Sequence, residues 1–267
     1  MPQISIILPT YNVELYIARA LQSCINQTFK DIEIIVVDDC GNDKSIEIAK
    51  EYAKKDERIK IIHNEKNLGT FASRNQGVLN SNSPYIMFLD PDDYLELNAC
   101  EIVVKNIKSE FDLLCFDAFV HRVKTKQFYR FKKDEIFTQE QFLEFLTNQK
   151  HYCWSVWAKV FKKDLILKSF EKIDIFERIC YGEDVLFCYF YFMLCEKIAV
   201  FKECLYHYEF NEKGRYENKN KEILWQNCQD KKRSLEILKT IKNDFWEFNE
   251  KFFLNLEKEI EGLKGRL

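Results

Sequence analysis

Short, mainly apolar runs alternate with longer amphipathic stretches in the first part of the chain. The runs lie at residues 4–8, 32–37, 59–62 and 85–89, and the stretches lie at residues 14–27, 45–54 and 70–79. A short apolar run is typical of a strand that is buried on both faces, whereas apolar positions three and four residues apart are typical of a helix. Strand and helix in alternation predict an α/β fold with a mostly parallel central sheet flanked by helices.

The alternation becomes less regular after residue 93. We predict strands at residues 111–120, 127–131 and 154–161, helices at residues 138–146 and 185–194, and a short strand that ends at residues 206–208. Thr138 and Gln141 have the spacing of a capping box, which favours a helix that starts at Thr138. The apolar helix 185–194 follows Glu183 and Asp184, and acids are favoured at a helix N-terminus even without a further role.

The C-terminal part carries a regular apolar seam between Leu235 and Leu263, with charged residues between the apolar positions. The seam consists of Leu238, Ile241, Phe245, Phe248, Phe252, Leu256, Ile260 and Leu263. This pattern predicts one long amphipathic helix. Because its spacing is close to a heptad repeat, two interpretations stay open: the helix pairs with a second copy in a homodimer, or it docks on its own domain.

Composition narrows the class of protein. With 267 residues, of which 46% are hydrophobic and 31% charged, the chain is long enough to bury a sizeable core. A net charge of −3 and a pI near 6.0 give no electrostatic footprint for nucleic acid. The ten cysteines contain no C-x-x-C pair, so free thiols in a reducing compartment are expected rather than a zinc site. The chain shows no signal peptide and no membrane-spanning run, which predicts a cytoplasmic protein, with a position peripheral to a membrane left open.

Polar segments follow each predicted strand of the first part. They are Pro9 to Asn12, Asp38 with Asp39, Asn67 to Arg74, and Asp90 to Asp93. Because right-handed crossovers bring the C-terminal ends of parallel strands to one edge, we expect these segments to line one cleft. The sequence has neither a G-x-G-x-x-G motif nor a P-loop to hold phosphate. The clustered carboxylates instead suit a divalent cation that bridges phosphates, although an acidic surface turn would have the same composition.

Together these residues resemble the family-two glycosyltransferases of the GT-A fold. The matching motifs are Ile-Ile-Leu-Pro-Thr-Tyr-Asn at 6–12, Ile-Ile-Val-Val-Asp-Asp at 34–39, Asn67-Leu68-Gly69 with Arg74-Asn75, Phe-Leu-Asp-Pro-Asp-Asp at 88–93, and Glu183-Asp184. The resemblance is dense over residues 3–98 and thinner to about residue 210. It implies a Rossmann-like GT-A sheet, and it points to bacterial lipooligosaccharide or capsule galactosyl- and glucosyltransferases.

The resemblance implies a UDP-sugar donor and a set of residues that bind it. Pro9, Thr10, Tyr11 and Asp39 are expected to form the wall for uracil and ribose. Arg74 is expected on the phosphate side, where a cation offsets the charge of a diphosphate. Arg215 is a further hypothetical contact of the diphosphate.

The resemblance also implies a metal ion, Mn²⁺ or Mg²⁺, at the D-x-D pair. Asp92 is expected to bind it directly, Asp90 to face the ribose or the metal, and Asp93 to support them. His207 resembles a position that adds a late metal ligand in some members of the family. A histidine with a purely structural role is the open alternative for that position.

Asp184 resembles the general base of the family, and Glu183 is expected to shape the acceptor pocket. Displacement with one base inverts the anomer, because the acceptor attacks from the side opposite the departing UDP. Trp154 and Trp157 are expected either to stack on acceptor sugars or to fill the core of the second half, and both interpretations stay open.

These implications define the predicted function. The chain is expected to transfer galactose, glucose or an N-acetyl form from a UDP-sugar to a hydroxyl of a glycan acceptor, expected to be lipid-linked, in the biosynthesis of surface lipooligosaccharide or polysaccharide. A position at the cytoplasmic face of the inner membrane stays open. Residues 1–98 form the donor half, residues 99–220 the acceptor half, and residues 221–267 a helical extension for oligomerisation or docking. The alternatives are a non-catalytic binding module for carbohydrate or nucleotide-sugar and a sugar-nucleotide pyrophosphorylase. The second would need a glycine-rich, basic loop where Pro9 to Asn12 stand.

Overall fold

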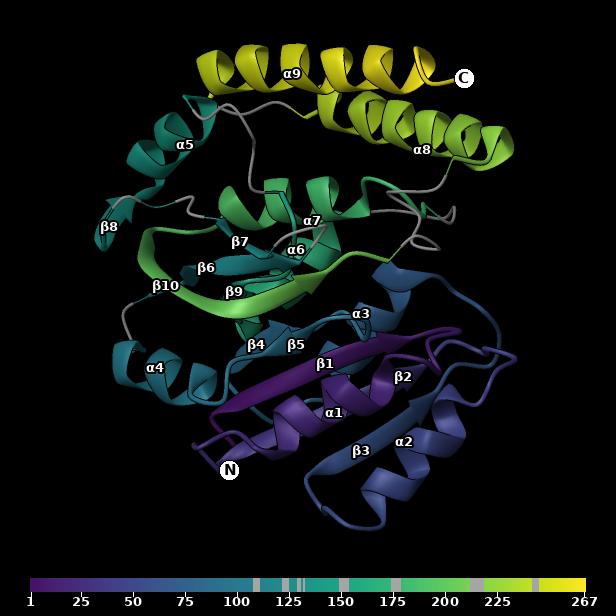
Figure 1. Cartoon of the computed structure of the whole chain (residues 1–267). Helices are drawn as coiled ribbons and strands as arrows, with labels where there is room; N and C mark the ends of the chain where they lie inside the picture. The colour runs from purple at the N-terminus through teal and green to yellow at the C-terminus, as the bar shows by residue number, and fades with distance from the viewer. Residues whose placement is uncertain are drawn as a thin grey trace.

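A computed structural model of the chain shows an α/β fold built on one large mixed sheet (Figure 1). It describes residues 1–107, 111–121, 125–128, 131, 133–148, 154–173, 179–211, 219–241 and 245–267. The sheet runs in the order β3-β2-β1-β4-β9-β6-β10-β5, with β7 paired to β6 and β8 paired to β10. The predicted α/β fold with a central sheet flanked by helices is confirmed, but the sheet is mixed rather than mostly parallel, because β5, β7, β8 and β9 pair with their neighbours antiparallel.

The first half consists of parallel strands joined by helices, as the apolar pattern predicted. The strands are β1 (Ile4–Thr10), β2 (Ile32–Asp38), β3 (Ile59–His63) and β4 (Tyr85–Phe88), and the helices are α1 (Ile17–Ile25), α2 (Ser45–Ala53) and α3 (Thr70–Leu79). β1 lies between β2 and β4 and is parallel to both. All residues of β1 are buried, because helices or other chain segments cover both faces.

The second half extends the same sheet. Its elements are β5 (Tyr94–Leu95), α4 (Ala99–Asn106), β6 (Leu113–His121), β7 (Thr125–Phe128), β8 (Glu135–Thr138), α5 (Gln139–Thr147), β9 (Lys159–Lys162), α6 (Lys163–Lys172), α7 (Glu183–Phe192) and β10 (Lys197–Glu209). β9 is antiparallel to both β4 and β6 and thereby joins the two halves. The capping box of Thr138 and Gln141 is present at the start of α5, as predicted.

The predicted strand at residues 154–161 is shorter than the sequence suggested. Only β9, from Lys159 onward, has sheet pairing, and residues 154–158 form an irregular turn in which Ala158 has a φ of 54°. The apolar run misled because the turn is buried as deeply as a strand: Trp154 and Val156 both lie in the core. Similarly, β7 covers residues 125–128, and residues 129–130 of the predicted strand 127–131 lie outside the described part of the chain.

The C-terminal part forms two helices, α8 (Lys221–Lys239) and α9 (Trp246–Lys264). The predicted C-terminal helix is present as α9, but the apolar seam from Leu235 to Leu263 is divided between the two helices instead of lying on one. The two lie side by side over α7 (Figure 1). Ion pairs of Lys231 with Glu259 and of Lys239 with Glu257 join them. The periodicity misled because apolar residues on two packed helices face the same buried layer and so keep one rhythm across the break.

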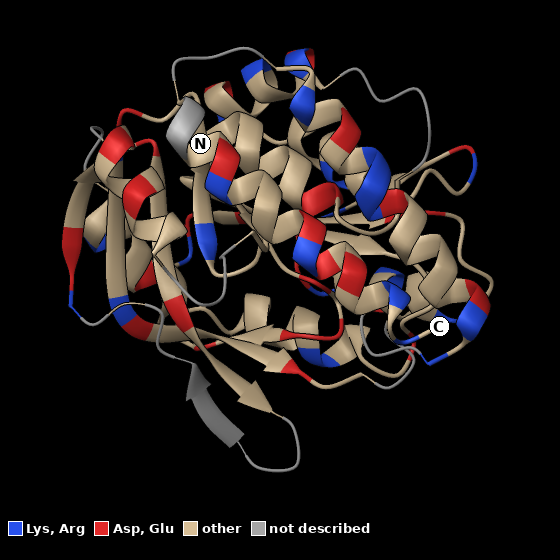
Figure 2. Ribbon diagram, turned by 90° about the horizontal axis from the view of Figure 1, so that it is seen from above, with Lys and Arg blue, Asp and Glu red and all other residues tan. Residues whose placement is uncertain are grey.

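The apolar seam of α9 docks on its own chain. Phe252 is fully buried, with its ring centroid 4.5 Å from that of Trp154 and 5.4 Å from that of Tyr189 on α7. Burial of one such side chain contributes about 1.5–3 kcal/mol. Acidic and basic positions alternate along the two C-terminal helices (Figure 2). In the part of the chain that the structure describes, no helix combines the length and the apolar character needed to cross a bilayer.

Gly77 lets α3 approach β1 closely, and this contact yields a stability prediction. A Cβ atom at Gly77 would clash with the side chain of Ile7, which is rigid and fully buried. We expect Gly77→Ala to destabilise the fold by about 1–3 kcal/mol, measured by urea unfolding. Gly262→Ala in α9 is the matched control, because a Cβ atom there would meet nothing within 4 Å. That control should raise stability by up to about 1 kcal/mol, and equal behaviour of the two variants would contradict the proposed contact.

Candidate active site

The C-terminal ends of β1 and β2 and the loop before α3 meet at one edge of the sheet. The backbone N–H of Asp39 donates to the carbonyl of Thr10 over 3.0 Å. Thr10 and Asp39 are buried, whereas Tyr11 exposes 49% of its surface beside them. An exposed aromatic ring next to a buried strand end can serve as a stacking platform for a base.

Asp39 organises the loop that opens α3. Its carboxylate accepts hydrogen bonds from the backbone N–H groups of Leu68 (2.7 Å) and Gly69 (2.8 Å) and from the Asn64 amide (2.8 Å). Gly69 stands at φ 88°, a left-handed conformation that side chains disfavour. The acid that sequence resemblance assigned to the uracil wall therefore also fixes the loop in front of Arg74.

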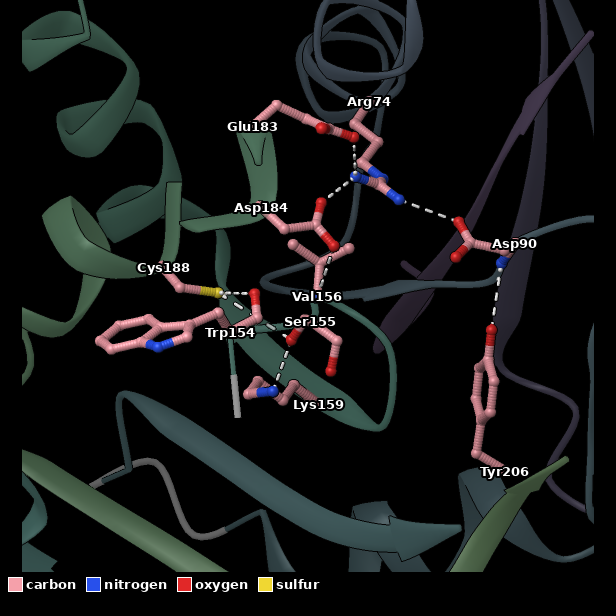
Figure 3. A network of polar contacts seen from close by, with 10 residues as sticks. All are labelled: Arg74, Asp90, Trp154, Ser155, Val156, Lys159, Glu183, Asp184, Cys188 and Tyr206. Carbon is pink, nitrogen blue, oxygen red and sulfur yellow. Dashed lines mark hydrogen bonds and ion pairs between the residues drawn. The ribbon is translucent and has the colours of Figure 1, made fainter. Parts of the chain in front are cut away.

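Arg74 is the centre of the site (Figure 3). It lies on α3 with 5% of its surface exposed, and its guanidinium contacts acids from two other elements. Nη1 donates to Asp184 Oδ1 over 2.5 Å and lies 3.7 Å from Glu183 Oε1, and Nη2 donates to Asp90 Oδ1 over 2.9 Å. The sequence placed Arg74 on the phosphate side, but its pairing with the expected base was not foreseen.

Asp184 and Glu183 are the first two residues on the N-terminal turn of α7, after Gly182 at φ 86°. Burial raises the pKa of Asp184 above its usual range, although the positive charge of Arg74 opposes the shift. Burial and the neighbouring charge of Asp184 raise the pKa of Glu183 to about 7. Burial disfavours the charge on Arg74, but the surrounding carboxylates outweigh it and raise its pKa, so Arg74 is a permanent cation.

The acids after β4 form a tight turn with Asp93 inside. Asp93 is buried, and its carboxylate accepts from the Tyr206 hydroxyl (2.6 Å) and the Glu209 N–H (2.7 Å). The Tyr206 hydroxyl also accepts from the Asp90 N–H over 3.3 Å. Burial and the charges of Asp92 and Asp90 raise the pKa of Asp93. Sequence reasoning missed Tyr206, because a tyrosine in an apolar strand gives no signal of a hydroxyl directed at an acid.

Asp92 lies closer to solvent than Asp93 and accepts a hydrogen bond from the Asn211 amide over 2.9 Å. Burial and the charge of Asp90 raise the pKa of Asp92. Mutual repulsion of this kind is relieved when a cation binds between carboxylates. The chemistry of Asp90 and Asp92 therefore fits a divalent metal ion.

The fit is limited to these two acids. Within the described ranges, no group of three or more His, Cys, Asp or Glu side chains is arranged to hold a metal ion. A Mg²⁺-type cation that keeps waters and binds substrate phosphates needs only one or two protein carboxylates. Asp90 and Asp92 meet that requirement, since Arg74 is shown on one oxygen of Asp90 and Asn211 on one oxygen of Asp92.

His207 is placed differently from the expected metal ligand. Its Nε2 lies 2.7 Å from Glu96 Oε1, and its Nδ1 lies 2.8 Å from His121 Nε2. Its ring stacks between Tyr94, at 4.1 Å, and Phe119, at 4.8 Å. Because both ring nitrogens are engaged, the structural alternative for His207 agrees better with its surroundings.

The two tryptophans have different environments. Trp154 exposes 6% of its surface and packs on Phe252 and Phe192, so of its two interpretations the one that fits is a side chain that fills the core. Burial of the Trp154 ring in the core stabilises the fold more than its exposure to solvent would. Trp157 is partly exposed and stacks on Tyr206 with 5.3 Å between centroids. Arg215 lies outside the described residues.

Comparison with known families and curated proteins identifies relatives of the chain. The profile of the family described as "Glycosyl transferase family 2" matches residues 5–168. The glycosyltransferase EpsJ of Bacillus subtilis, described as uncharacterized, is 32% identical over 218 residues. That alignment covers 79% of this chain and 62% of EpsJ, so the chain spans less than two thirds of that relative.

Solved structures share the fold. TarS of S. aureus in complex with UDP-GlcNAc has a TM-score of 0.75 at 21% identity, with 95% of this chain and 72% of that chain covered. The mannosyltransferase PcManGT from Pyrobaculum calidifontis in complex with GDP-Man and Mn²⁺ has a TM-score of 0.66 at 14% identity, with 97% of this chain and 70% of that chain covered. At these identities the likeness establishes the GT-A architecture.

The charge balance around Arg74 yields a prediction about pH. A carboxylate whose pKa is raised in the folded state binds its proton more tightly there, so stability falls as pH rises from about 4.5 toward 7. Arg74→Met removes the cation that limits this effect at Glu183 and Asp184. We expect its loss of stability to grow from pH 5 to pH 8 and to reach about 3 kcal/mol, measured by denaturant unfolding at each pH.

Lys239→Met is the control for this experiment. Lys239 is 47% exposed at its side chain and pairs with Glu257 on α9, which is 46% exposed and lies outside the acids of the site. Its effect should be small across the same pH range. A loss of stability in Arg74→Met that does not depend on pH would contradict the proposed charge balance.

Proposed function

The chain belongs to glycosyl transferase family 2, and we propose that it is an inverting transferase for a hexose from a UDP-sugar. The acceptor in this proposal is a hydroxyl group of a surface glycan or its lipid-linked precursor. The observation that carries the proposal is the single polar network in which Asp90, Arg74 and Asp184 meet. This network connects two places. One is the sheet edge at which α/β proteins bind nucleotides, and the other is a carboxylate suited to act as a base.

The donor is proposed to lie along the ends of β1 and β2. Pro9, Thr10 and Asp39 line that edge, and the exposed ring of Tyr11 offers a face for uracil. TarS, which has the same fold, was solved with UDP-GlcNAc, and this supports a UDP-sugar as the donor class. Galactose, glucose and their N-acetyl forms all remain candidates for the transferred sugar.

Asp90 and Asp92 are proposed to hold Mn²⁺ or Mg²⁺ on the diphosphate. A metal ion bound there would stabilise the negative charge of the departing UDP as a Lewis acid. PcManGT, with the same fold, was solved with Mn²⁺, which supports the choice of cation. Arg74 holds a fixed positive charge beside Asp90. This charge would stabilise the departing UDP together with the metal ion.

Asp184 is proposed as the general base. As the acceptor oxygen attacks the anomeric carbon, its proton passes to the Asp184 carboxylate and a new C–O bond forms. The bond from the anomeric carbon to the diphosphate oxygen breaks, and its electron pair leaves with UDP. The raised pKa of Asp184 makes it a stronger base than an exposed aspartate, and the positive charge of Arg74 favours its ionised form.

The acceptor is proposed to approach from the side of Trp157 and Glu183. Trp157 presents a partly exposed ring, and Glu183 lies next to Asp184 on α7. In this arrangement residues 1–98 bind the donor, residues 99–220 bind the acceptor, and residues 221–267 brace the acceptor half. A homodimer through the C-terminal helices and a peripheral position of the chain at the inner membrane are further parts of the proposal.

Two substitutions separate the enzyme from a non-catalytic binding module. Asp184→Asn should keep Mn²⁺-assisted UDP binding by calorimetry but lower sugar transfer or donor hydrolysis by about 10²–10⁴-fold, because only the base is lost. Asp92→Asn should weaken the metal-assisted binding of UDP itself. UDP release would be measured with UDP-galactose, UDP-glucose and their N-acetyl forms in turn.

Asp56→Asn is the matched control, because Asp56 pairs with Arg58 just before β3, at the opposite end of the sheet. It should leave both UDP binding and turnover unchanged. If wild-type protein took up UDP with Mn²⁺ yet released none from any of these donors, the binding-module alternative would replace the proposal.

A further inference from the structure

Lys159 is fully buried and lies close to the site, but it has no role in the proposed chemistry. It is the first residue of β9, and its ammonium donates to the carbonyl of Ser155 over 2.5 Å. Burial of an ammonium group costs free energy unless the group forms hydrogen bonds. The contacts of Lys159 should therefore explain why it is buried here. In the sheet, Lys159 lies opposite Cys115 of β6. The fully buried Asp117 lies two residues further along the same face of β6.

The carbonyl that Lys159 holds belongs to the same peptide group as the N–H of Val156. That N–H donates to Asp184 Oδ2 over 3.3 Å (Figure 3). Because a trans peptide is planar, its C=O and N–H point in opposite directions. An ammonium on the carbonyl side therefore keeps the N–H directed at the carboxylate, and a flipped peptide would instead turn a carbonyl oxygen toward Asp184.

The turn that carries this peptide is held from both ends. The Cys188 thiol on α7 donates to the carbonyl of Trp154 over 3.0 Å, and the Trp154 ring is packed in the core. Ala158 closes the turn with a φ of 54°, an uncommon conformation for a residue with a side chain. Such a turn needs outside contacts to select one peptide orientation, and Lys159 supplies one directly at the relevant carbonyl.

We propose that Lys159 is a positioning residue for the base: it fixes the Ser155–Val156 peptide so that its N–H orients and stabilises the ionised carboxylate of Asp184. This inference rests on the proposed function for its kinetic consequences. Arg74 binds Oδ1 and the peptide binds Oδ2, so the two together set the plane of the carboxylate. The ammonium also polarises the peptide, which strengthens the N–H as a donor.

Lys159→Met tests the proposal, because it keeps the apolar stem and removes the ammonium. We expect kcat to fall roughly tenfold, the scale of one hydrogen bond to a charged group. The KM for the UDP-sugar should stay unchanged. The acidic limb of the kcat profile should move to higher pH, because the ionised form of Asp184 loses a donor. Lys159→Arg, which retains a cation and donors, should recover part of the rate.

Lys162→Met is the matched control on the same strand. Lys162 forms an ion pair with Asp112 over 3.2 Å and is 36% exposed at its side chain. We expect it to change stability without moving the pH profile. A folded Lys159→Met variant with the wild-type profile, or with the same profile as Lys162→Met after a similar loss of stability, would overturn the proposal.

Hydrogen exchange provides a readout that does not need activity. In the wild-type protein the Val156 amide should exchange slowly although it lies in a turn, and Lys159→Met should accelerate its exchange while Lys162→Met should not. Exchange of the wild-type Val156 amide at the rate of an unprotected peptide would overturn the proposal even if the methionine variant failed to fold. If no sugar transfer were found, this measurement would still decide the role of Lys159 separately from the proposed function.

Discussion

One buried guanidinium balances the acids of the site, and much of the local structure serves that contact. Arg74 meets Asp90 from the end of β4 and Glu183 and Asp184 from the start of α7. A buried cation without partners would be strongly unfavourable, and so would these acids without a cation. Burial raises the pKa of Glu183 and Asp184, and because three carboxylates surround one cation, the neighbouring negative charges add to the shift. A divalent cation bound beside Asp90 would bring positive charge to the same place.

The sequence predicted the first half of the fold well, because each of its strands and helices is recognisable from residues that are close together in the chain. β1 and β4 are apolar runs of strand length, and Pro9 and Pro91 mark where regular pairing has to end. Once the strands are parallel, handedness alone brings their C-terminal ends together, so Arg74 and Asp90 were expected in one cleft. The pairing of Arg74 with Asp184 was not predictable in that way, since those residues are 110 positions apart and meet only through packing of α7.

The wrong predictions came from apolar patterns, which show that a residue is buried but not which neighbouring element it faces. Trp154 lies in an apolar run, and such a run describes a buried turn as well as a strand or an acceptor site. The seam from Leu238 to Leu263 likewise records one buried layer, which two helices share. Tyr206 gave no signal, because its hydroxyl acts on Asp93 and Asp90 only after β10 is placed beside β5. In each case the missing information is the orientation of an element relative to its neighbours.

The same contacts bear on how the chain divides. The donor motifs end before residue 98, but every acid of the donor turn is held from the second half: Asp90 and Asp93 by Tyr206, and Asp92 by Asn211. β9 from the second half also pairs with β4 and covers its free edge. A donor half by itself would leave one edge of β4 unpaired and a buried arginine without Asp184. The division at residue 98 therefore separates motifs, whereas the folded unit and its site require both halves together.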